Sequence, residues 1–200
     1  AAQDIVGYET YVRMAGPFTA AQVIHASDNR EELDRARHAL ALAATGRSVV
    51  VVSSGDPGIF AMAAAVMEAL HGTDDPAWHG VELTVMPGIS AAQGAAARAG
   101  APLGHDFCIL SLSDNLKPWE VIERRLDHAA AADLVMAFYN PISKARPWQL
   151  GRALEIIRGH RTPATPVVLG RDVGRAGETL RVVSLGELSA GDVDMRTVVI

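Results

Sequence analysis

The chain has 200 residues and a mass of 21.1 kDa, with 49% hydrophobic and 20% charged residues, which excludes a disordered tail, a collagen-like fibre and a disulfide-stapled miniprotein. A net charge of −5 and an aromatic content of 5% argue against a nucleic-acid partner, and the longest apolar run, 59–67, is far shorter than the roughly 20 residues of a membrane span. The single cysteine and the lack of a signal-peptide pattern predict a cytoplasmic globular protein with no membrane partner.

Short β-branched segments alternate with longer alanine- and leucine-rich segments, which is typical of an α/β protein. In the first half, the pattern predicts helices over 30–45, 60–70 and 90–99 and strands over 47–53 and 81–86. The valine run 49–52 shows no polar alternation, so this strand is expected to be buried on both faces.

A turn-rich segment at 101–104 is the best candidate for a domain junction, and it predicts two lobes, 1–102 and 103–200. The second half should contain strands over 107–112, 134–139, 166–169, 180–183 and 197–200, with helices beginning near Pro118 and Pro147. Because little helix separates the last three strands, antiparallel pairs are expected there. We therefore predict a mostly parallel sheet in the N-terminal lobe and a mixed sheet in the C-terminal lobe.

Five strand ends lead into loops of small and polar residues, at 53–58, 86–92, 111–119, 138–146 and 171–177. In open α/β sheets, ligands bind beyond the carboxyl ends of the strands. The first loop has neither the dinucleotide nor the nucleotide-triphosphate glycine spacing. A plain turn with Asp56 as a helix cap is its structural alternative, and a capped helix starting at Ser90 is the alternative for the second loop.

Lysine is rare in this chain, and both lysines, Lys117 and Lys144, lie in these strand-end loops. If the sheet is parallel, the two loops converge. Together with Arg146, Lys144 places two cations within three residues, which suits an anionic group; a solvated loop is the alternative.

Other catalytic signatures are missing from the sequence. The seven histidines form no H-x-x-x-H or H-x-H pair, so no metal site is predicted, and no G-x-S-x-G elbow indicates a hydrolase nucleophile. His105 and Asp106 are adjacent and could form an acid–base pair, although adjacent strand residues face opposite sides of a sheet. The sequence does not identify the proton-transfer residue, and His105, Asp106 and Asp114 are the candidates.

Three segments, in this order and spacing, resemble the tetrapyrrole methylases that depend on S-adenosylmethionine: Ser54-Gly55-Asp56-Pro57, Pro87-Gly88-Ile89-Ser90-Ala91-Ala92 and Phe138-Tyr139-Asn140-Pro141. Longer stretches, such as Leu110-Ser111-Leu112-Ser113-Asp114, resemble one branch of that family. This branch methylates ring carbon C17 of a reduced, metal-free tetrapyrrole and contracts the ring during cobalamin biosynthesis. The resemblance runs from end to end of the chain.

The resemblance implies a two-lobed α/β fold, a homodimer, and S-adenosylmethionine bound in a cleft between the lobes, with S-adenosylhomocysteine as product and no metal. It also implies that the family's first strand and Gly-rich loop would precede Ala1 and that a Gly-Asn-Ser would follow Ile200; without them, the first lobe should have an unpaired sheet edge. Carried over residue by residue, the donor contacts are Ser54, Gly55, Asp56, Ile59, Ser90, Ala91, Tyr139, Asn140, Val173 and Gly174.

The substrate of such an enzyme carries many carboxylates, so we expect cations to bind it. The hypothesis names Lys117, Lys144 and Arg146 for this role, with Ser111, Ser113 and Asp114 near the macrocycle. One alternative is a methylase that acts on a neighbouring or cobalt-loaded intermediate. Another is a non-catalytic nucleotide-binding α/β protein.

Overall fold

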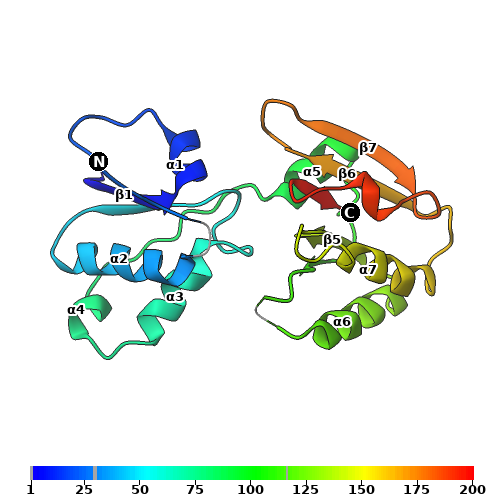
Figure 1. The fold of residues 1–200 in the computed structure, drawn as a ribbon, viewed down its shortest axis with the longest axis horizontal. Coiled ribbons are helices and arrows are strands. Elements are labelled where there is room, and N and C mark those ends of the chain that lie inside the picture. The colour runs from blue at the N-terminus through cyan, green and yellow to red at the C-terminus, as the bar shows by residue number, and fades with distance from the viewer. Residues whose placement is uncertain (1, 29–30, 116) are drawn as a thin grey trace. The chain divides into compact units, whose positions relative to one another are not determined.

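A computed structural model describes residues 2–28, 31–115 and 117–200, and it separates the chain into two compact units, Ala1–Ser90 and Ala91–Ile200 (Figure 1). The sequence places the junction at 101–104 instead. The difference is helix α5 (Ala91–Ala99), which packs on the sheet of the second unit. A Cβ added to Gly170 in that sheet would lie 2.9 Å from the Cβ of Ala95, so the helix sits tightly against the strand.

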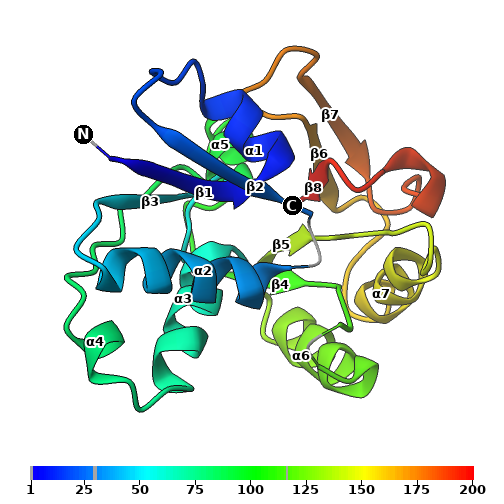
Figure 2. The same ribbon diagram turned by 60° about the vertical axis from the view of Figure 1, so that its left-hand side comes forward.

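The first unit contains a three-stranded parallel sheet in the order β2-β1-β3 (Figure 2). Its strands are β1 (Asp4–Tyr8), β2 (Val23–Ser27) and β3 (Val49–Val52). Its helices are α1 (Glu9–Ala15), α2 (Glu32–Ala44), α3 (Met62–His71) and the short α4 (Pro76–His79). The parallel sheet confirms the predicted class, while β1, β2, α1 and α4 were not predicted.

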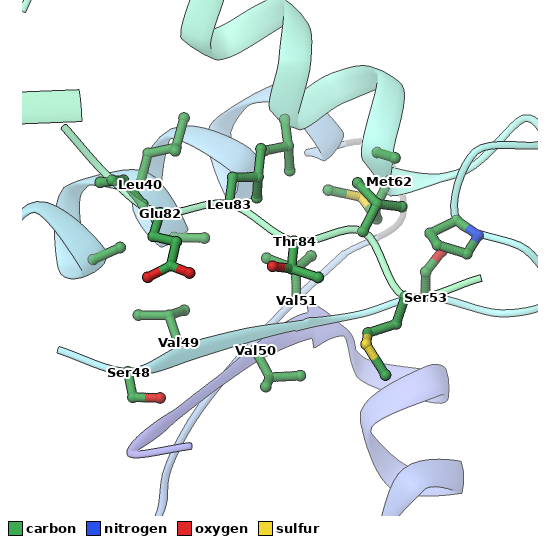
Figure 3. Close-up of a pocket in the computed structure, with 18 of the residues that line it drawn as sticks. Leu40, Ser48, Val49, Val50, Val51, Ser53, Met62, Glu82, Leu83 and Thr84 are labelled. Carbon is green, nitrogen blue, oxygen red and sulfur yellow. The ribbon is translucent and has the colours of Figure 1, made fainter. Parts of the chain in front are cut away.

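Two expectations for the first unit are wrong. Residues 81–86, predicted as a strand, form no regular secondary structure, and residues 82–89 are exposed. Strand β3 is not buried on both faces, because Val50 is 45% exposed. Val51 packs against the cluster that α2 and α3 build, whereas the neighbouring Val50 points to the opposite face (Figure 3). Among the described residues, β3 pairs only with β1, so its other edge carries no strand.

The second unit contains a five-stranded mixed sheet in the order β4-β5-β8-β6-β7 (Figure 2). Its strands are β4 (Phe107–Ser111), β5 (Val135–Tyr139), β6 (Pro166–Arg171), β7 (Thr179–Ser184) and β8 (Thr197–Val199). Besides α5, its helices are α6 (Trp119–Ala131), α7 (Gln149–Arg158) and the 3-10 helix η1 (Ala190–Asp192). The β4–β5 pair is parallel and the others are antiparallel, which confirms the mixed sheet.

Alternating side chains divide the core of the second unit between the two faces of its sheet. Met136 and Phe138 of β5 pack into the cluster that includes α6 and α7, while Ala137 packs with α5 on the other face. Because β4 and β5 are parallel neighbours in register from Phe107 to Ser111, their carboxyl ends lie at one edge of the sheet. None of the helices in the described part of the chain is long and apolar enough to cross a membrane.

Candidate functional site

The carboxylate of Asp56 joins two loops of the first unit. Its Oδ1 accepts a hydrogen bond from the backbone N–H of Gly58 at 2.8 Å, and its Oδ2 accepts one from Gly88 N–H at 3.1 Å. The helix that follows begins only at Met62, so Asp56 does not cap it. The first and second predicted loops are therefore one structural unit, held by a side chain that bonds to the backbone.

Glycine makes this contact between the loops possible. A Cβ at Gly88 would lie 2.3 Å from the carbonyl oxygen of Gly55, which no real side chain tolerates. Gly55 itself has φ +70°, in the region that glycine adopts most easily. The predicted donor contacts Gly55 and Asp56 thus lie against the loop that leads to the buried Ser90.

Large apolar side chains lie beside this polar contact. Met86 is 75% exposed and Ile89 is 77% exposed, and the two residues flank Pro87 and Gly88. Phe60, just after the predicted contact Ile59, is also exposed and has φ +51°, which is unusual for a bulky residue and is typical of functional loops. An apolar surface next to a carboxylate suits a ligand with an apolar and a polar part.

A groove of about 930 Å³ runs along β3 and the extended segment 81–88 (Figure 3). Its lining is mostly aliphatic, with side chains such as Leu40, Val51 and Leu83, while Glu82 and Thr84 add polar atoms. Gly55 and Gly88 also belong to its lining. Most of this groove therefore suits an apolar occupant, and its polar contacts are few.

The loops after β4 and β5 of the second unit are joined by side chains. Asn140 donates from Nδ2 to the Oγ of Ser111 at 2.9 Å, and Ser111 Oγ also accepts from Ser113 N–H at 3.3 Å. Asn140 has φ +51°, a conformation that asparagine tolerates better than most residues. Parallel pairing brings Ser111 opposite Tyr139, so the predicted residues of both loops meet at one sheet edge.

Tyr139 connects this edge to helix α5. Its hydroxyl oxygen accepts a hydrogen bond from the backbone N–H of Ala92 at 2.8 Å. The first N–H groups of a helix have no partner within the helix, so the phenol satisfies one of them. Three predicted donor contacts, Ala91, Tyr139 and Asn140, are thereby placed in one neighbourhood of the second unit.

A charged cluster lies next to these residues. Arg146 donates from Nη1 to the carboxylate of Asp114 and from Nη2 to the side-chain oxygen of Asn115. Gln149 donates from Nε2 to the same Asp114 oxygen, Oδ1, at 3.0 Å. Asp114 and Arg146 come from loops that the sequence expected to converge, and this contact shows that they do. Asn115 and Gln149 were not predicted, because only the fold brings them to Arg146 and Asp114.

The two lysines have different environments. Lys117 donates from Nζ to the carbonyl of Ser113 at 3.3 Å, and burial, followed by the nearby Arg125, lowers its pKa, with Asp114 acting in the opposite direction. Lys144 is exposed, and no carboxylate within 2–28, 31–115 or 117–200 forms an ion pair with it. The three predicted cations are therefore not equivalent, because Arg146 is already paired.

Ion pairs and hydrogen bonds hold the fifth predicted loop, 171–177, at the end of β6. Asp172 is buried at the end of β6 and accepts from Arg196 Nε at 2.7 Å and from Arg171 Nη1 at 2.9 Å. Glu178 accepts from the backbone N–H of Gly174 at 2.6 Å. A Cβ at Gly94 of α5 would lie 2.9 Å from Cγ1 of Val173, so this valine packs against the helix.

His105 and Asp106 are not brought to these loops. They precede β4, at the opposite end of that strand from Ser111, and both are exposed. Of the three proton-transfer candidates, only Asp114 lies in the charged cluster.

Histidine spacing in the sequence does not predict a side-chain network that lies in the first unit. Asp4, 1% exposed, accepts from Arg47 Nε at 2.5 Å and from His25 Nε2 at 2.9 Å, and the other ring nitrogen of His25 lies 2.9 Å from Nε2 of His38. The hydrogen bond from Arg47 lowers the pKa of Asp4 to about 2, against the effect of burial. Nowhere in the described ranges do three or more histidine, cysteine or acidic side chains form a group that could hold a metal ion.

Comparison with known proteins identifies the family. Residues 2–189 match the family model of the Tetrapyrrole (Corrin/Porphyrin) Methylases. The chain belongs to this family. This confirms the predicted resemblance and, with the two sheets described above, the predicted fold class.

Curated relatives extend the match over the whole chain. It is 56% identical over 201 residues to a precorrin-3B C(17)-methyltransferase of Sinorhizobium sp, with 100% of this chain and 78% of the relative covered. It is 50% identical over 204 residues to the cobalamin biosynthesis protein CobIJ of Mycobacterium tuberculosis, covering 100% of this chain and 39% of that protein. It is 39% identical over 200 residues to a probable cobalt-factor III C(17)-methyltransferase of Salmonella typhimurium, covering 100% of this chain and 81% of the relative.

Solved structures show the same fold. The crystal structure of the methyltransferase CobJ matches with a TM-score of 0.94 and 54% identity, covering 99% of this chain and 82% of that one. Uroporphyrin-III C-methyl transferase from Thermus thermophilus, complexed with S-adenyl homocysteine, matches with a TM-score of 0.66 and 20% identity, covering 99% and 84%. The second likeness concerns the fold alone.

Proposed function

We propose that this chain methylates ring carbon C17 of a reduced tetrapyrrole, with S-adenosylmethionine as donor and with ring contraction, in cobalamin biosynthesis. The observation that carries the proposal is the 56% identity, over the whole chain, to a relative named precorrin-3B C(17)-methyltransferase. The strand-end loops that resemble the family are also the loops in which the polar contacts gather.

The proposed donor contacts are Ser54, Gly55, Asp56, Ile59, Ser90, Ala91, Tyr139, Asn140, Val173 and Gly174. The donor supplies a methyl group already activated by its sulfonium, so the chain's residues have to bind and orient it. The exposed apolar surface of Ile89 beside the Asp56 carboxylate fits a molecule with an apolar base and a polar sugar. Because Gly174 N–H already bonds to Glu178, its carbonyl is the group left for the ligand.

The proposed substrate contacts lie in the loops after β4 and β5. Their cations, Lys117, Lys144 and Arg146, suit a macrocycle that carries carboxylates, in a chain whose net charge is −5. Ser111 is hydrogen-bonded to Asn140 and to Ser113 N–H at the same sheet edge, which supports our assignment of both serines to the macrocycle. Asp114 is the proton-transfer candidate in this cluster.

Calorimetric titration with S-adenosylmethionine and S-adenosylhomocysteine tests the donor half of the proposal. We expect both to bind, and failure of both would contradict it. Incubation with metal-free precorrin-3B and the donor, followed by mass spectrometry, should then show the gain of one methyl group. Donor binding without a mass gain on any tetrapyrrole would favour the non-catalytic nucleotide-binding alternative.

A cobalt-loaded substrate is the second candidate, favoured by the 39% identity to a relative named probable cobalt-factor III C(17)-methyltransferase. The same assay with cobalt-factor III decides between them, because the natural substrate should have the higher kcat/KM. We also propose that the protein is a cytoplasmic homodimer, as the resemblance implies. Analytical ultracentrifugation should show a particle with about twice the mass of one chain, which is 21.1 kDa.

A further inference from the structure

The charged cluster has a buried support that the proposed contacts do not include. Gln149 is 2% exposed and is the first residue of α7. Its amide and the guanidinium of Arg146 donate to the same oxygen of Asp114, and Arg146 also bonds to Asn115. We call these four residues the Asp114 latch. It fastens the loop after β4 to the loop after β5 and to the start of α7.

The latch cancels the charge of Arg146. The side chains of Asp114 and Arg146 are 22% and 29% exposed, so the pair is partly shielded from water and its attraction is stronger than that of a surface pair. A carboxylate that approached Arg146 would therefore meet a neutral pair and not a free cation. Gln149 adds a donor without adding charge, which keeps the pair neutral.

The latch also holds the turn that carries Lys144. Ser143 N–H donates to Arg146 O at 3.3 Å, and Arg146 N–H donates back to Ser143 O at 3.1 Å. The Oγ of Ser143 accepts a further bond from Arg146 N–H at 3.1 Å. Lys144 lies at the tip of this closed turn and is exposed. Fixing the Arg146 side chain thus fixes the base of the turn from which Lys144 projects.

We propose that Asp114, Arg146 and Gln149 are positioning residues, which hold the turn that carries Lys144. Lys144 itself contacts the substrate carboxylates and determines the preference for a polyanionic tetrapyrrole. This rests on the proposed function, which assigns the loops to the substrate. It changes Arg146 from a substrate contact, and Asp114 from a proton-transfer candidate near the macrocycle, to supports of the Lys144 turn, and it adds Gln149.

The first test measures how salt affects the binding of uroporphyrin III, a polycarboxylated porphyrin used as the probe. Lys144→Gln should weaken binding about fivefold at low salt and reduce the salt dependence, because an exposed charge acts through a screened field. It should leave the unfolding temperature unchanged. Arg152→Ala removes another exposed cation, one that α7 carries and that pairs with Glu123 and Glu155, and it serves as the control with wild-type binding. Wild-type affinity in Lys144→Gln would overturn the proposal.

The second test is a double-mutant cycle. Asp114→Asn and Arg146→Ala should each weaken porphyrin binding, by no more than the roughly fivefold effect of Lys144→Gln. The double variant removes both charges of the pair, so it should be no weaker than either alone and should keep the wild-type salt dependence. Gln149→Leu should behave like them, and Arg146→Lys should restore part of the affinity. Lys144→Gln combined with Asp114→Asn should weaken binding little more than Lys144→Gln alone, because the latch acts on binding through Lys144. Additive effects for Asp114 and Arg146, or a reduced salt dependence in the double variant that lacks both charges, would show that Arg146 itself contacts the anion and would overturn the latch.

Failure of the proposed function is separable from failure of the latch. If the wild-type protein binds neither S-adenosylhomocysteine nor the porphyrin, the proposed function is contradicted. The same Asp114–Arg146 cycle read by thermal unfolding then still measures the coupling that the latch requires, and an absence of coupling there would overturn the latch on its own.

Discussion

The loops of the two units are held together by different kinds of contact. In the first unit, a carboxylate bonds to backbone N–H groups, and two glycines bring main chains into contact. In the second unit, side chains bond to side chains, as in the Asn140–Ser111 and Arg146–Asp114 pairs. A backbone contact leaves no room for an added atom, whereas a side-chain pair responds to charge and salt. The first unit should therefore be sensitive to size and the second to electrostatics.

Gly88→Ala should have the largest effect, because its Cβ would lie 2.3 Å from the carbonyl oxygen of Gly55. We expect a loss of about 1–3 kcal/mol in the free energy of unfolding, the usual cost of overpacking, together with weaker binding of S-adenosylhomocysteine. Denaturant unfolding and calorimetry measure the two effects. Gly151→Ala is the control: it has open space around its Cβ position in α7, and it should stabilise by about 0.5–1 kcal/mol. Equal stability of the two variants would contradict the size argument.

Asp56→Ala should come next, since it leaves the N–H groups of Gly58 and Gly88 without their acceptor. We expect a cost of about 1 kcal/mol and a clear loss of S-adenosylhomocysteine affinity. Asp56→Asn should recover only part of this stability and affinity, because its amide nitrogen would face a backbone donor. The matched comparison is Asp75→Asn, where one oxygen accepts from Ala77 N–H at the start of α4 and the amide oxygen suffices. A wild-type affinity in Asp56→Ala would show that the loops hold together without this carboxylate.

Asp4 is an exception in the first unit, because side chains pair with it and charge should therefore matter there. The hydrogen bond from Arg47 lowers the pKa of Asp4 to about 2 from the usual 3.8. A carboxyl group with a lowered pKa stabilises the fold fully above the unfolded value, and this stabilisation is lost as the pH falls through the folded value. Thermal unfolding should thus show that the wild-type protein loses stability between about pH 4 and pH 2. This loss should be smaller in Asp4→Asn, after correction for the lower starting stability of that variant. Parallel curves for the two proteins would refute this assignment.

Much of the fold could be predicted from local pattern, and the failures have physical reasons. The helices and strands of the second unit follow apolar periodicity, and so does α2. The run 81–86 alternates like a strand but has no partner among the described residues, and strands need hydrogen-bonded neighbours as well as pattern. The loops of the site were visible as strand ends, whereas Gln149 was not, because only the fold brings it to Asp114. The His25–His38 contact joins β2 to α2 and leaves no local motif.

Glu178 combines both kinds of contact in one side chain, so it can separate their contributions. One oxygen accepts from the backbone N–H of Gly174, and the other pairs with Arg98 of α5. Glu178→Gln keeps an acceptor for the backbone and removes the charge, while Glu178→Ala removes both. Because a half-exposed ion pair contributes at most about 1 kcal/mol, we expect Glu178→Gln to lose about 0.5 kcal/mol. In Glu178→Ala, the amide of Gly174 should in addition exchange faster with deuterium, since its acceptor is gone. If the glutamine variant exchanges as fast as the alanine variant, then the ion pair, and not the backbone bond, holds this loop, and the loop would belong with the charge-sensitive contacts of its own unit.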